Sequence, residues 1–265
     1  FNGVEGARLR TKKLRGVISQ GLILKLNVAS DFLDNPTFTG EGTVADCLAD
    51  YLGIQKWERP VVEQGNSKPK GNFPSFIPKT DQERVQNIDL NEVISKGETF
   101  EVTTKLDGSS MTIYWLDDLH NGVCSRNLEL KEDDESHFSQ FNNQSKSLER
   151  IKDYCIANNE KLAFQGELMG GKIQGNREGF NELRWFIYSI FDIETQAYIN
   201  PSIARDIVEE IGFEYVPYHG DISLDDLFTT RQDILDYADS EPSINHKIRE
   251  GVVFKSLDSE FSFKA

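Results

Sequence analysis

Alternating apolar and polar residues predict a series of strands in the second half of the chain. The runs lie at residues 99–105, 110–116, 161–168, 184–193 and 250–255. They are rich in the β-branched and aromatic side chains that favour strands. Because a short connection separates the first two runs, we expect those two strands to pair antiparallel rather than through a βαβ crossover.

Helical patterns lie between and after these strands, at residues 147–157, 200–212, 223–228 and 231–238. The pattern at 200–212 has Asn at the cap, Pro in the first turn and Gly at the end, which are the usual start and stop signals of a helix. We therefore predict the α+β class, with mixed, mainly antiparallel sheets flanked by helices.

The N-terminal part of the chain gives weaker signals. Residues 43–52 place Val44, Leu48, Tyr51 and Leu52 on one helical face. Residues 56–79 are rich in Pro, Gly, Asn and Lys, which predicts a long irregular connection at the edge of a subdomain.

Composition narrows the class of protein. The chain has 265 residues with 38% hydrophobic content, enough for a substantial core. It has no run of about 18 apolar residues, so we predict no membrane span and no membrane partner. Its three widely spaced cysteines argue against a disulfide framework and for an intracellular, reducing compartment. The first residue is not Met, and no signal-peptide pattern follows it.

The net charge of the chain limits how it could bind nucleic acid. The formal net charge is −15, which disfavours non-specific attraction to nucleic acid. Residues 8–15 are basic, however, and an acidic protein can still bind a polyanion through one basic groove.

Candidate chemistry begins at the sequence "KLDG", residues 105–108. A lysine amine is a nucleophile only when it is neutral, and nearby cations favour the neutral form. We expect Lys105 to lie among the cations available in the chain, namely Arg84, Arg126, Lys255 and Lys264. Asp107 lies two residues from Lys105 and could hold the water shell of a metal ion. The alternative is a hairpin with an exposed Lys-Asp pair, because Asp-Gly is a common turn signal.

Further motifs follow in a fixed order, and together they carry a family resemblance. They are "CSRN" with Arg126, "FQGELMG" with Glu167, "FIYSIFDI" with Tyr188, "REGVVFK" with Glu250 and "FSFKA" with Lys264. The succession resembles that of the covalent nucleotidyltransferases, which comprise ATP-dependent DNA and RNA ligases and mRNA capping enzymes. Four letters alone are weakly specific, but this order of elements is not.

Two segments before the nucleophile narrow the resemblance. "RLRTKKLRGVISQGL" (8–22) and "PKTDQERVQNI" (78–88) resemble the leader of RNA ligases of the Deinococcus and Naegleria type, in which a small OB-like domain precedes the catalytic domain. In DNA ligases and capping enzymes an OB domain follows instead. We therefore expect residues 1–265 to form one nucleotidyltransferase domain of the DNA/RNA ligase type, unrelated to ATP-grasp. In it, residues 1–79 are the leader and irregular connection, and we expect no complete OB domain.

The resemblance implies roles for the cationic residues. Lys105 would attack the α-phosphorus of ATP and form a lysyl-AMP phosphoramidate. Lys264 and Lys255 would neutralise the α-phosphate and the departing pyrophosphate, because phosphoryl transfer depends on positioning and charge neutralisation. Arg84 would contact the β- and γ-phosphates, and Arg126 the ribose or an incoming 5′-phosphate.

It also implies roles for the acidic and base-binding residues. Asp107, Glu167 and Glu250 would hold Mg²⁺ or Mn²⁺ through water, since magnesium keeps several of its waters. Glu167 and Glu250 would also contact the nucleotide near the ribose and α-phosphate. The Tyr188 ring would stack on adenine, with Val252 or its neighbours on the other face of the base.

Thr104, beside the nucleophile, is expected to contact the nucleotide. Ordinary structural roles stay open: Arg84 in an ion pair with Asp81 or Glu83, Arg126 in a hairpin salt bridge, and Tyr188 as a core aromatic. A glycosidase-like pair of carboxylates is also conceivable, but it would leave Lys105 without a role. The four histidines show no ligand spacing, and we assign them no function.

We predict an ATP-dependent RNA ligase, acting as a monomer on nicked or broken RNA with 5′-phosphate and 3′-OH ends. AMP would pass from ATP to Lys105, then to the 5′-phosphate, and would leave when the 3′-OH attacks. The alternatives are a DNA ligase, a capping-type enzyme that uses GTP, and an inactive nucleic-acid-binding relative.

Overall fold

The computed structural model describes residues 12–14, 17–19, 48, 51–53 and 68–265. The chain divides into two compact units, residues 1–60 and residues 61–265, and each is described by itself. In the first unit β1 (Lys12–Leu14) and β2 (Val17–Ser19) pair antiparallel. Leu48 and Tyr51 are helical, while the other residues predicted to start that helix, Val44 among them, lie outside the described residues. The single catalytic domain over 1–265 stays a prediction.

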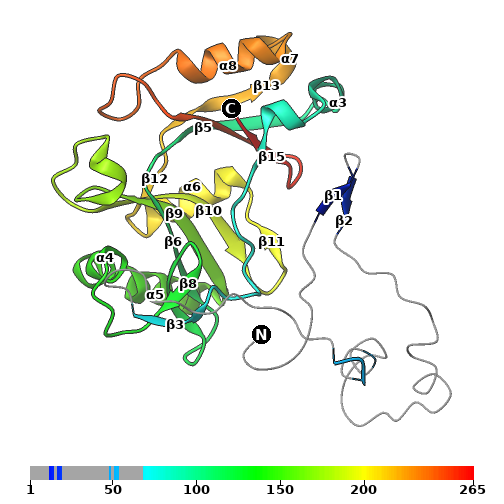
Figure 1. The fold of residues 1–265 in the computed structure, drawn as a ribbon. Coiled ribbons are helices and arrows are strands. Elements are labelled where there is room, and N and C mark those ends of the chain that lie inside the picture. The colour runs from blue at the N-terminus through cyan, green and yellow to red at the C-terminus, as the bar shows by residue number, and fades with distance from the viewer. Residues whose placement is uncertain (1–11, 15–16, 20–47, 49–50, 54–67) are drawn as a thin grey trace. The chain divides into compact units, whose positions relative to one another are not determined.

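The second unit contains two sheets (Figure 1). The smaller sheet has the order β13-β5-β14-β15-β4. Its strands are β13 (Tyr218–Ser223), β5 (Thr99–Lys105), β14 (Gly251–Ser256), β15 (Ser262–Lys264) and β4 (Glu83–Arg84). Its pairs are antiparallel except for β15 with β4, which is parallel.

The larger sheet has eight strands in the order β11-β10-β9-β6-β7-β8-β3, with β12 parallel to β10. Its strands are β11 (Ala197–Tyr198), β10 (Arg184–Asp192), β9 (Leu162–Met169), β6 (Ser109–Trp115), β7 (Asn121–Ser125), β8 (Leu128–Leu130), β3 (Pro69–Asn72) and β12 (Glu214–Tyr215). The α+β class with mainly antiparallel sheets is thereby confirmed.

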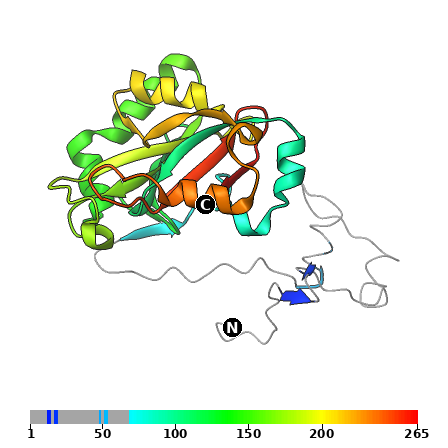
Figure 2. The ribbon, with the colours of Figure 1, turned by 90° about the horizontal axis from the view of Figure 1, so that it is seen from above.

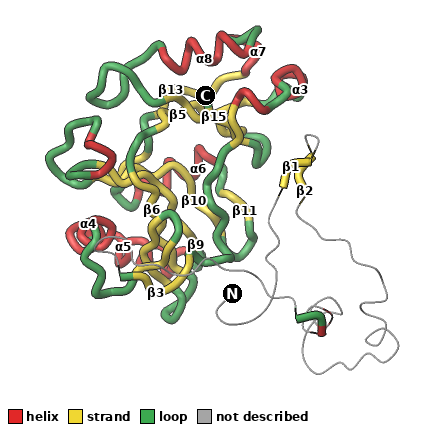
Figure 3. Tube along the Cα trace, viewed as in Figure 1, coloured by secondary structure: helices red, strands yellow, loops and turns green. Residues whose placement is uncertain are grey.

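Helices cover both sheets, as the red segments of Figure 3 show beside the yellow strands. The helices are α3 (Leu90–Ser95), α4 (His137–Ser145), α5 (Ser147–Asn158), α6 (Pro201–Glu210), α7 (Leu224–Leu227) and α8 (Arg231–Asp239), with 3₁₀ turns at Val85–Asn87 and Ile173–Asn176. Among the described residues no helix is long and apolar enough to cross a membrane.

One face of the smaller sheet is apolar and lies against α3, α7 and α8 (Figures 1 and 2). Its core includes the fully buried side chains Phe100 and Val102 of β5, Val252 and Phe254 of β14, and Phe263 of β15. Because side chains alternate along a strand, Glu101, Thr103 and Lys105 point to the opposite face. The polar face of this sheet therefore carries the candidate nucleophile at its partly exposed end, while Glu101 and Thr103 are buried.

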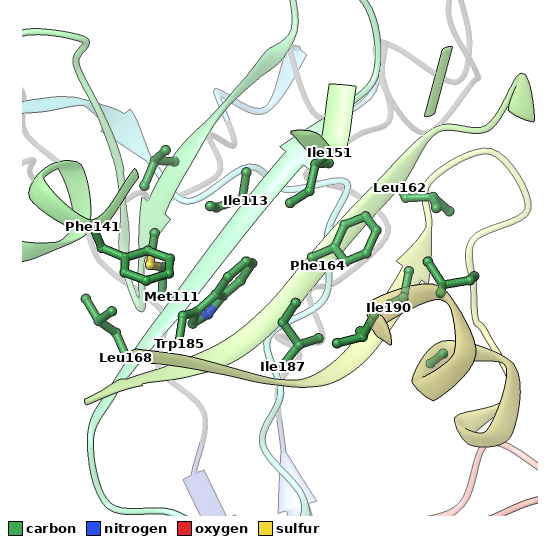
Figure 4. Close-up of a cluster of buried hydrophobic side chains, with 14 of the residues drawn as sticks. Met111, Ile113, Phe141, Ile151, Leu162, Phe164, Leu168, Trp185, Ile187 and Ile190 are labelled. Atoms are coloured by element: carbon green, nitrogen blue, oxygen red, sulfur yellow. The ribbon is translucent and has the colours of Figure 1, made fainter. Parts of the chain in front are cut away.

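The larger sheet buries a second core against α4, α5 and α6. Figure 4 shows Met111, Ile113, Phe164 and Trp185 from its strands in one cluster with Ile151 of α5. This core fixes β9 and β10, which carry Glu167 and Tyr188, and β6, which directly follows the nucleophile motif.

Local signals explain where the helices begin. The Asn200 side chain accepts a hydrogen bond from the Ser202 amide and Pro201 occupies the first turn of α6, as predicted. A capping box between Thr230 and Asp233 starts α8.

The predicted strands and helices of the second unit are observed to within a few residues. Two predictions about their arrangement are wrong. β5 and β6 do not pair with each other, because β5 pairs with β13 and β14 while β6 pairs with β7 and β9. Residues 56–79 are also not irregular throughout, because β3 (Pro69–Asn72) pairs with β8 at the edge of the larger sheet.

Candidate active site

Lys105 lies where the chain passes from one sheet to the other. It is the last residue of β5 in the smaller sheet, and β6 of the larger sheet begins at Ser109. The alternative of an exposed Lys-Asp hairpin is therefore excluded, since these two strands are not neighbours in a ladder. Residues 105–109 instead bring the end of β5 close to β9, the neighbour of β6.

Gly108 makes this close approach possible. A Cβ atom at Gly108 would lie 2.5 Å from the Leu168 carbonyl oxygen and 2.9 Å from Cγ of Met169. Any side chain at this position would thus push the segment away from β9. The Gly108 amide also donates a hydrogen bond to Oε1 of Glu167 at 3.1 Å, which ties the nucleophile motif to the predicted Glu167 motif.

The Lys105 ammonium forms an ion pair with the Glu250 carboxylate. Strand register explains the contact, because Gly251, the first residue of β14, is paired directly with Lys105. The two side chains are 31% and 33% exposed, so the pair is open to a ligand. We expected cations around Lys105, but the side chain that contacts its ammonium is the carboxylate Glu250.

Glu167 lies in the same group of charges. Burial, with smaller contributions from the charges of Glu250 and Asp107, raises the pKa of Glu167 to about 7 against the lowering effects of the Gly108 amide and Lys105. Glu167 thus interacts with Lys105, Asp107 and Glu250, and Lys105 pairs with Glu250. An excess of carboxylates around one amine is a suitable environment for an additional cation.

This donor set fits a metal held through water. Among the residues that the structure describes, no three His, Cys, Asp or Glu side chains converge closely enough to hold a metal ion directly. Oxygen donors around a hydrated ion are what magnesium prefers. The water-mediated role of Asp107, Glu167 and Glu250 stays a prediction.

A row of directly paired residues crosses the polar face of the smaller sheet next to Lys105. Thr103 pairs with Val253, Val253 with Lys264, and Lys264 with Arg84. Paired residues project to the same side of a sheet, so this row shares the face of Lys105. Lys264 and Arg84 therefore supply positive charge on that face, and Arg84 is exposed.

The same alternation corrects two nucleotide-binding assignments. Val252 is 0% exposed and packs with Phe254 and Phe263 on the helix-covered face, away from Lys105. Val253, its neighbour, occupies the Lys105 face. Oγ1 of Thr104 is likewise turned away and hydrogen-bonds Nε2 of His219 at 2.7 Å.

Tyr188 lies on β10 at one wall of a cavity of about 150 Å³. Its hydroxyl forms a 2.8 Å hydrogen bond with Oγ1 of Thr80. Burial raises the pKa of Tyr188 to about 12, with a further contribution from the charge of Glu167, so the hydroxyl keeps its proton at neutral pH. Lys255 also lines this cavity, whereas Lys105 does not.

Arg126 is exposed and forms a 2.6 Å ion pair with Asp81. Asp81 follows Thr80 directly, and both residues line the cavity. A surface ion pair of this kind is weak, so its guanidinium remains available to a ligand.

Comparison with known proteins identifies the class. Residues 98–265 match the family model described as RNA ligase. The chain belongs to the RNA ligase family. Solved structures of Naegleria gruberi RNA ligase are similar over the whole chain: the protein with PPi, a variant with AMP and Mn, and a variant with ATP and Mn are each 40% identical, at a TM-score of 0.68. Each match covers 100% of this chain and 76% of the Naegleria chain. A search of curated proteins gave no match.

The predicted enzyme class and the α+β ligase fold are thus confirmed, and RNA is the substrate class of this RNA ligase. Its structure brings together Lys105, Asp107, Glu167 and Glu250, with Lys264 and Arg84 on the adjoining row. Lys255 is set apart from this group. It pairs with Glu101, four residues before Lys105, which is about 13 Å along the strand.

Sequence reasoning missed two residues that adjoin the site of the ligase. Arg249 directly precedes Glu250 and is 1% exposed; its guanidinium donates to the carbonyls of Ala238 and Tyr237 at the end of α8. His219 hydrogen-bonds Thr104 beside the nucleophile. The position of Arg249 next to the "EGVVFK" motif was the one available signal, and His219 gave none.

Proposed function

We propose that this RNA ligase uses ATP and that Lys105 carries the AMP. The Lys105 amine, after losing a proton, attacks the α-phosphorus; a P–N bond forms, the bond to the β-phosphate oxygen breaks, and pyrophosphate leaves. An oxygen of a 5′-phosphate end then attacks the same phosphorus and restores the amine. A 3′-OH attacks the activated 5′-phosphorus, and AMP leaves. The supporting observation is the ion pair of Lys105 with Glu250, close enough to Glu167 for the three charges to interact.

Positive side chains on the Lys105 face suit the charge of a triphosphate. Lys264 and Arg84, on the row next to Lys105, would bind the α-phosphate and the departing pyrophosphate. Arg126 would give up part of its weak contact with Asp81 to bind the ribose or the 5′-phosphate end. Tyr188, whose charged neighbours include Glu167 and Arg126, would contact the adenine ring.

Asp107, Glu167 and Glu250 would hold Mg²⁺ or Mn²⁺ through water. The ion, when bound, neutralises phosphate charge and stabilises the transition state. Structures of Naegleria gruberi RNA ligase variants contain Mn with ATP or AMP, which supports the same requirement here.

Glu250 has a second role in this proposal. A carboxylate beside an ammonium stabilises the charged form of the amine, and a charged amine does not attack phosphorus. Glu250 must therefore release Lys105 before AMP transfer, and it would do so once its own charge is met by a cation. The ion pair protects the amine until nucleotide and metal are present.

The proposed RNA substrate has a 5′-phosphate and a 3′-OH at a nick or break, and the ligase acts as a monomer. The test is incubation with α-labelled ATP and Mn²⁺, comparing wild type with Lys105→Arg and with the control Lys96→Arg. Lys96 is an exposed lysine after α3, outside the site. We expect label on wild type and Lys96→Arg and none on Lys105→Arg.

A second assay separates the alternatives. The labelled enzyme is offered nicked duplexes that differ in having RNA or DNA at the 3′-OH side. Sealing of the RNA nick supports the proposal, and preference for the DNA nick would favour a DNA ligase. Label from GTP instead of ATP would favour a capping-type enzyme, and no label from either would favour an inactive relative.

A further inference from the structure

Tyr188 is the extra residue of a β-bulge in the larger sheet. The register of β10 against β9 passes from Ile187–Gly166 to Ser189–Gln165, which leaves Tyr188 without a partner residue in β9. A bulge redirects a side chain and removes backbone groups from the regular ladder. The orientation of the Tyr188 ring therefore depends on what holds its backbone.

The Tyr188 carbonyl is held by residues from outside the β9–β10 ladder. It accepts a hydrogen bond from the Lys255 ammonium of β14, in the other sheet. The Tyr215 hydroxyl of β12 lies 3.2 Å from the same oxygen. Lys255 is thus a direct link between the smaller sheet and the bulge that carries Tyr188.

The environment of Lys255 suits a fixed, internal role. Lys255 is 8% exposed, and its Nζ atom lies 5.6 Å from the centroid of the Tyr188 ring and 5.8 Å from the centroid of the Tyr215 ring. Burial lowers the pKa of Lys255 to about 8, against the opposing effect of Glu101. Because the Lys255 ammonium is buried and already bonded to a carbonyl, it has little freedom to reach a phosphate at Lys105, about 13 Å along the strand.

A buried ion pair anchors this arrangement. The Glu101 carboxylate is fully buried and pairs with Arg205 of α6; it also accepts a 2.8 Å hydrogen bond from the Tyr215 hydroxyl. Glu101 is the register partner of Lys255. Burial raises the pKa of Tyr215 well above its usual value, so this hydroxyl remains a donor.

We propose that Lys255 is a positioning residue for Tyr188: it holds the bulge carbonyl, and thereby sets the ring that contacts the base, instead of binding the ATP phosphates. Tyr215, whose single hydroxyl proton is donated to Glu101, lies against the same carbonyl, and the Glu101–Arg205 pair thereby orients the Tyr215 ring. The inference rests on the proposed function in one respect, namely that Tyr188 contacts the nucleotide base.

The test is a double-mutant cycle on self-adenylylation with Lys255→Met and Tyr188→Ala. The ATP concentration that gives half-maximal rate and the rate at saturating ATP are measured separately. We expect each single variant to raise the half-saturating concentration about tenfold, with less than about a threefold change in the saturated rate. If Lys255 acts through Tyr188, the double variant behaves like Tyr188→Ala alone.

Each other result has a definite meaning. Multiplied effects in the double variant, or a Lys255→Met loss confined to the saturated rate, would overturn the inference and return Lys255 to the phosphates. If Tyr188→Ala leaves the half-saturating concentration unchanged, the base contact itself fails, and the inference with it. Lys255→Arg, which keeps a donor, should recover much of the affinity.

Should Lys255→Met fail to fold, as judged by circular dichroism, Tyr215→Phe replaces it in the same cycle. This variant keeps the ring and removes the hydroxyl, which donates to Glu101 and lies 3.2 Å from the Tyr188 carbonyl. We expect a smaller rise, about threefold, that disappears in the Tyr188→Ala background. A rise that persists in that background would overturn the proposal.

Discussion

Replacing Arg205 with leucine tests whether the Glu101–Arg205 pair stabilises the arrangement of the two sheets. Glu101 is 0% exposed, and Arg205 supplies its ion-pair partner from α6. Removing one partner of a buried ion pair costs about 3–5 kcal/mol, because the remaining charge stays buried. Tyr215 still donates to Glu101, so we expect the lower end, about 3 kcal/mol.

The assay is urea denaturation of the full chain followed by circular dichroism. Thermal unfolding should shift downward by about 6–12 °C for a loss of this size. Changing Glu101 to glutamine in the Arg205→Leu background should recover more than about 1 kcal/mol, because the buried charge is then gone.

The exposed pair Lys161–Glu194 provides the matched control. Its side chains are 40% and 61% exposed, and Lys161→Leu should cost less than about 1 kcal/mol. If Arg205→Leu costs no more than this control, or if Glu101→Gln worsens the Arg205→Leu variant, the reasoning about the buried charge is refuted.

Three further predictions concern the site. Gly108→Ala should destabilise the protein by about 1–3 kcal/mol and abolish adenylylation, whereas Gly71→Ala, whose Cβ would meet nothing within 4 Å, should leave both near wild type. Folding disfavours the charged form of Lys255, so between pH 8 and 10.5 the unfolded chain binds more protons than the folded chain. The free energy of unfolding should therefore rise across this range by about 3 kcal/mol relative to Lys255→Met. A difference between the two proteins that stays constant with pH in urea titrations would contradict the lowered pKa. For Glu167 the pH dependence of stability has the opposite sign, because its raised pKa makes the folded state bind the proton between pH 4.5 and about 7. Without metal, the free energy of unfolding should fall across that range by about 3 kcal/mol relative to Glu167→Gln. A difference between the two proteins that does not change with pH would show that the carboxyl is not buried as described.

Local patterns located five strands to within a few residues, missed others such as β7 and β13, and predicted the strand partners poorly. Alternation alone located β5 at residues 99–105, because it reflects one polar and one apolar face. The same pattern carries no information on which strand lies beside it. The choice of β13 and β14 over β6 depends on contacts between residues far apart in sequence, including Gly251 with Lys105.

The candidate site shows the same division. The order of the motifs was enough to select Lys105, Glu167 and Glu250, and the ligase fold and family are confirmed. Which of Val252 and Val253 faces the site depends on the phase of β14 against β5, and a shift of one residue reverses the face. The contact of Lys255 with the Tyr188 carbonyl depends on a bulge that no local pattern indicates.

Two helices were missed, α3 (Leu90–Ser95) and α4, the second for a related reason. α4 (His137–Ser145) has the sequence "HFSQFNNQS", in which few residues are apolar. It buries Ser139 and Phe141 and depends on packing against the larger sheet rather than on propensity. Sequence patterns could not show that support.

The central claim is that the Lys105 amine forms the covalent bond to AMP. The most direct measurement is peptide mapping by mass spectrometry after incubation of the wild-type ligase with ATP and Mn²⁺, under conditions that preserve a P–N bond. We expect AMP on the peptide that contains Lys105, released when pyrophosphate is added back. AMP on a peptide carrying Lys255 or Lys264, with Lys105 unmodified, would contradict it.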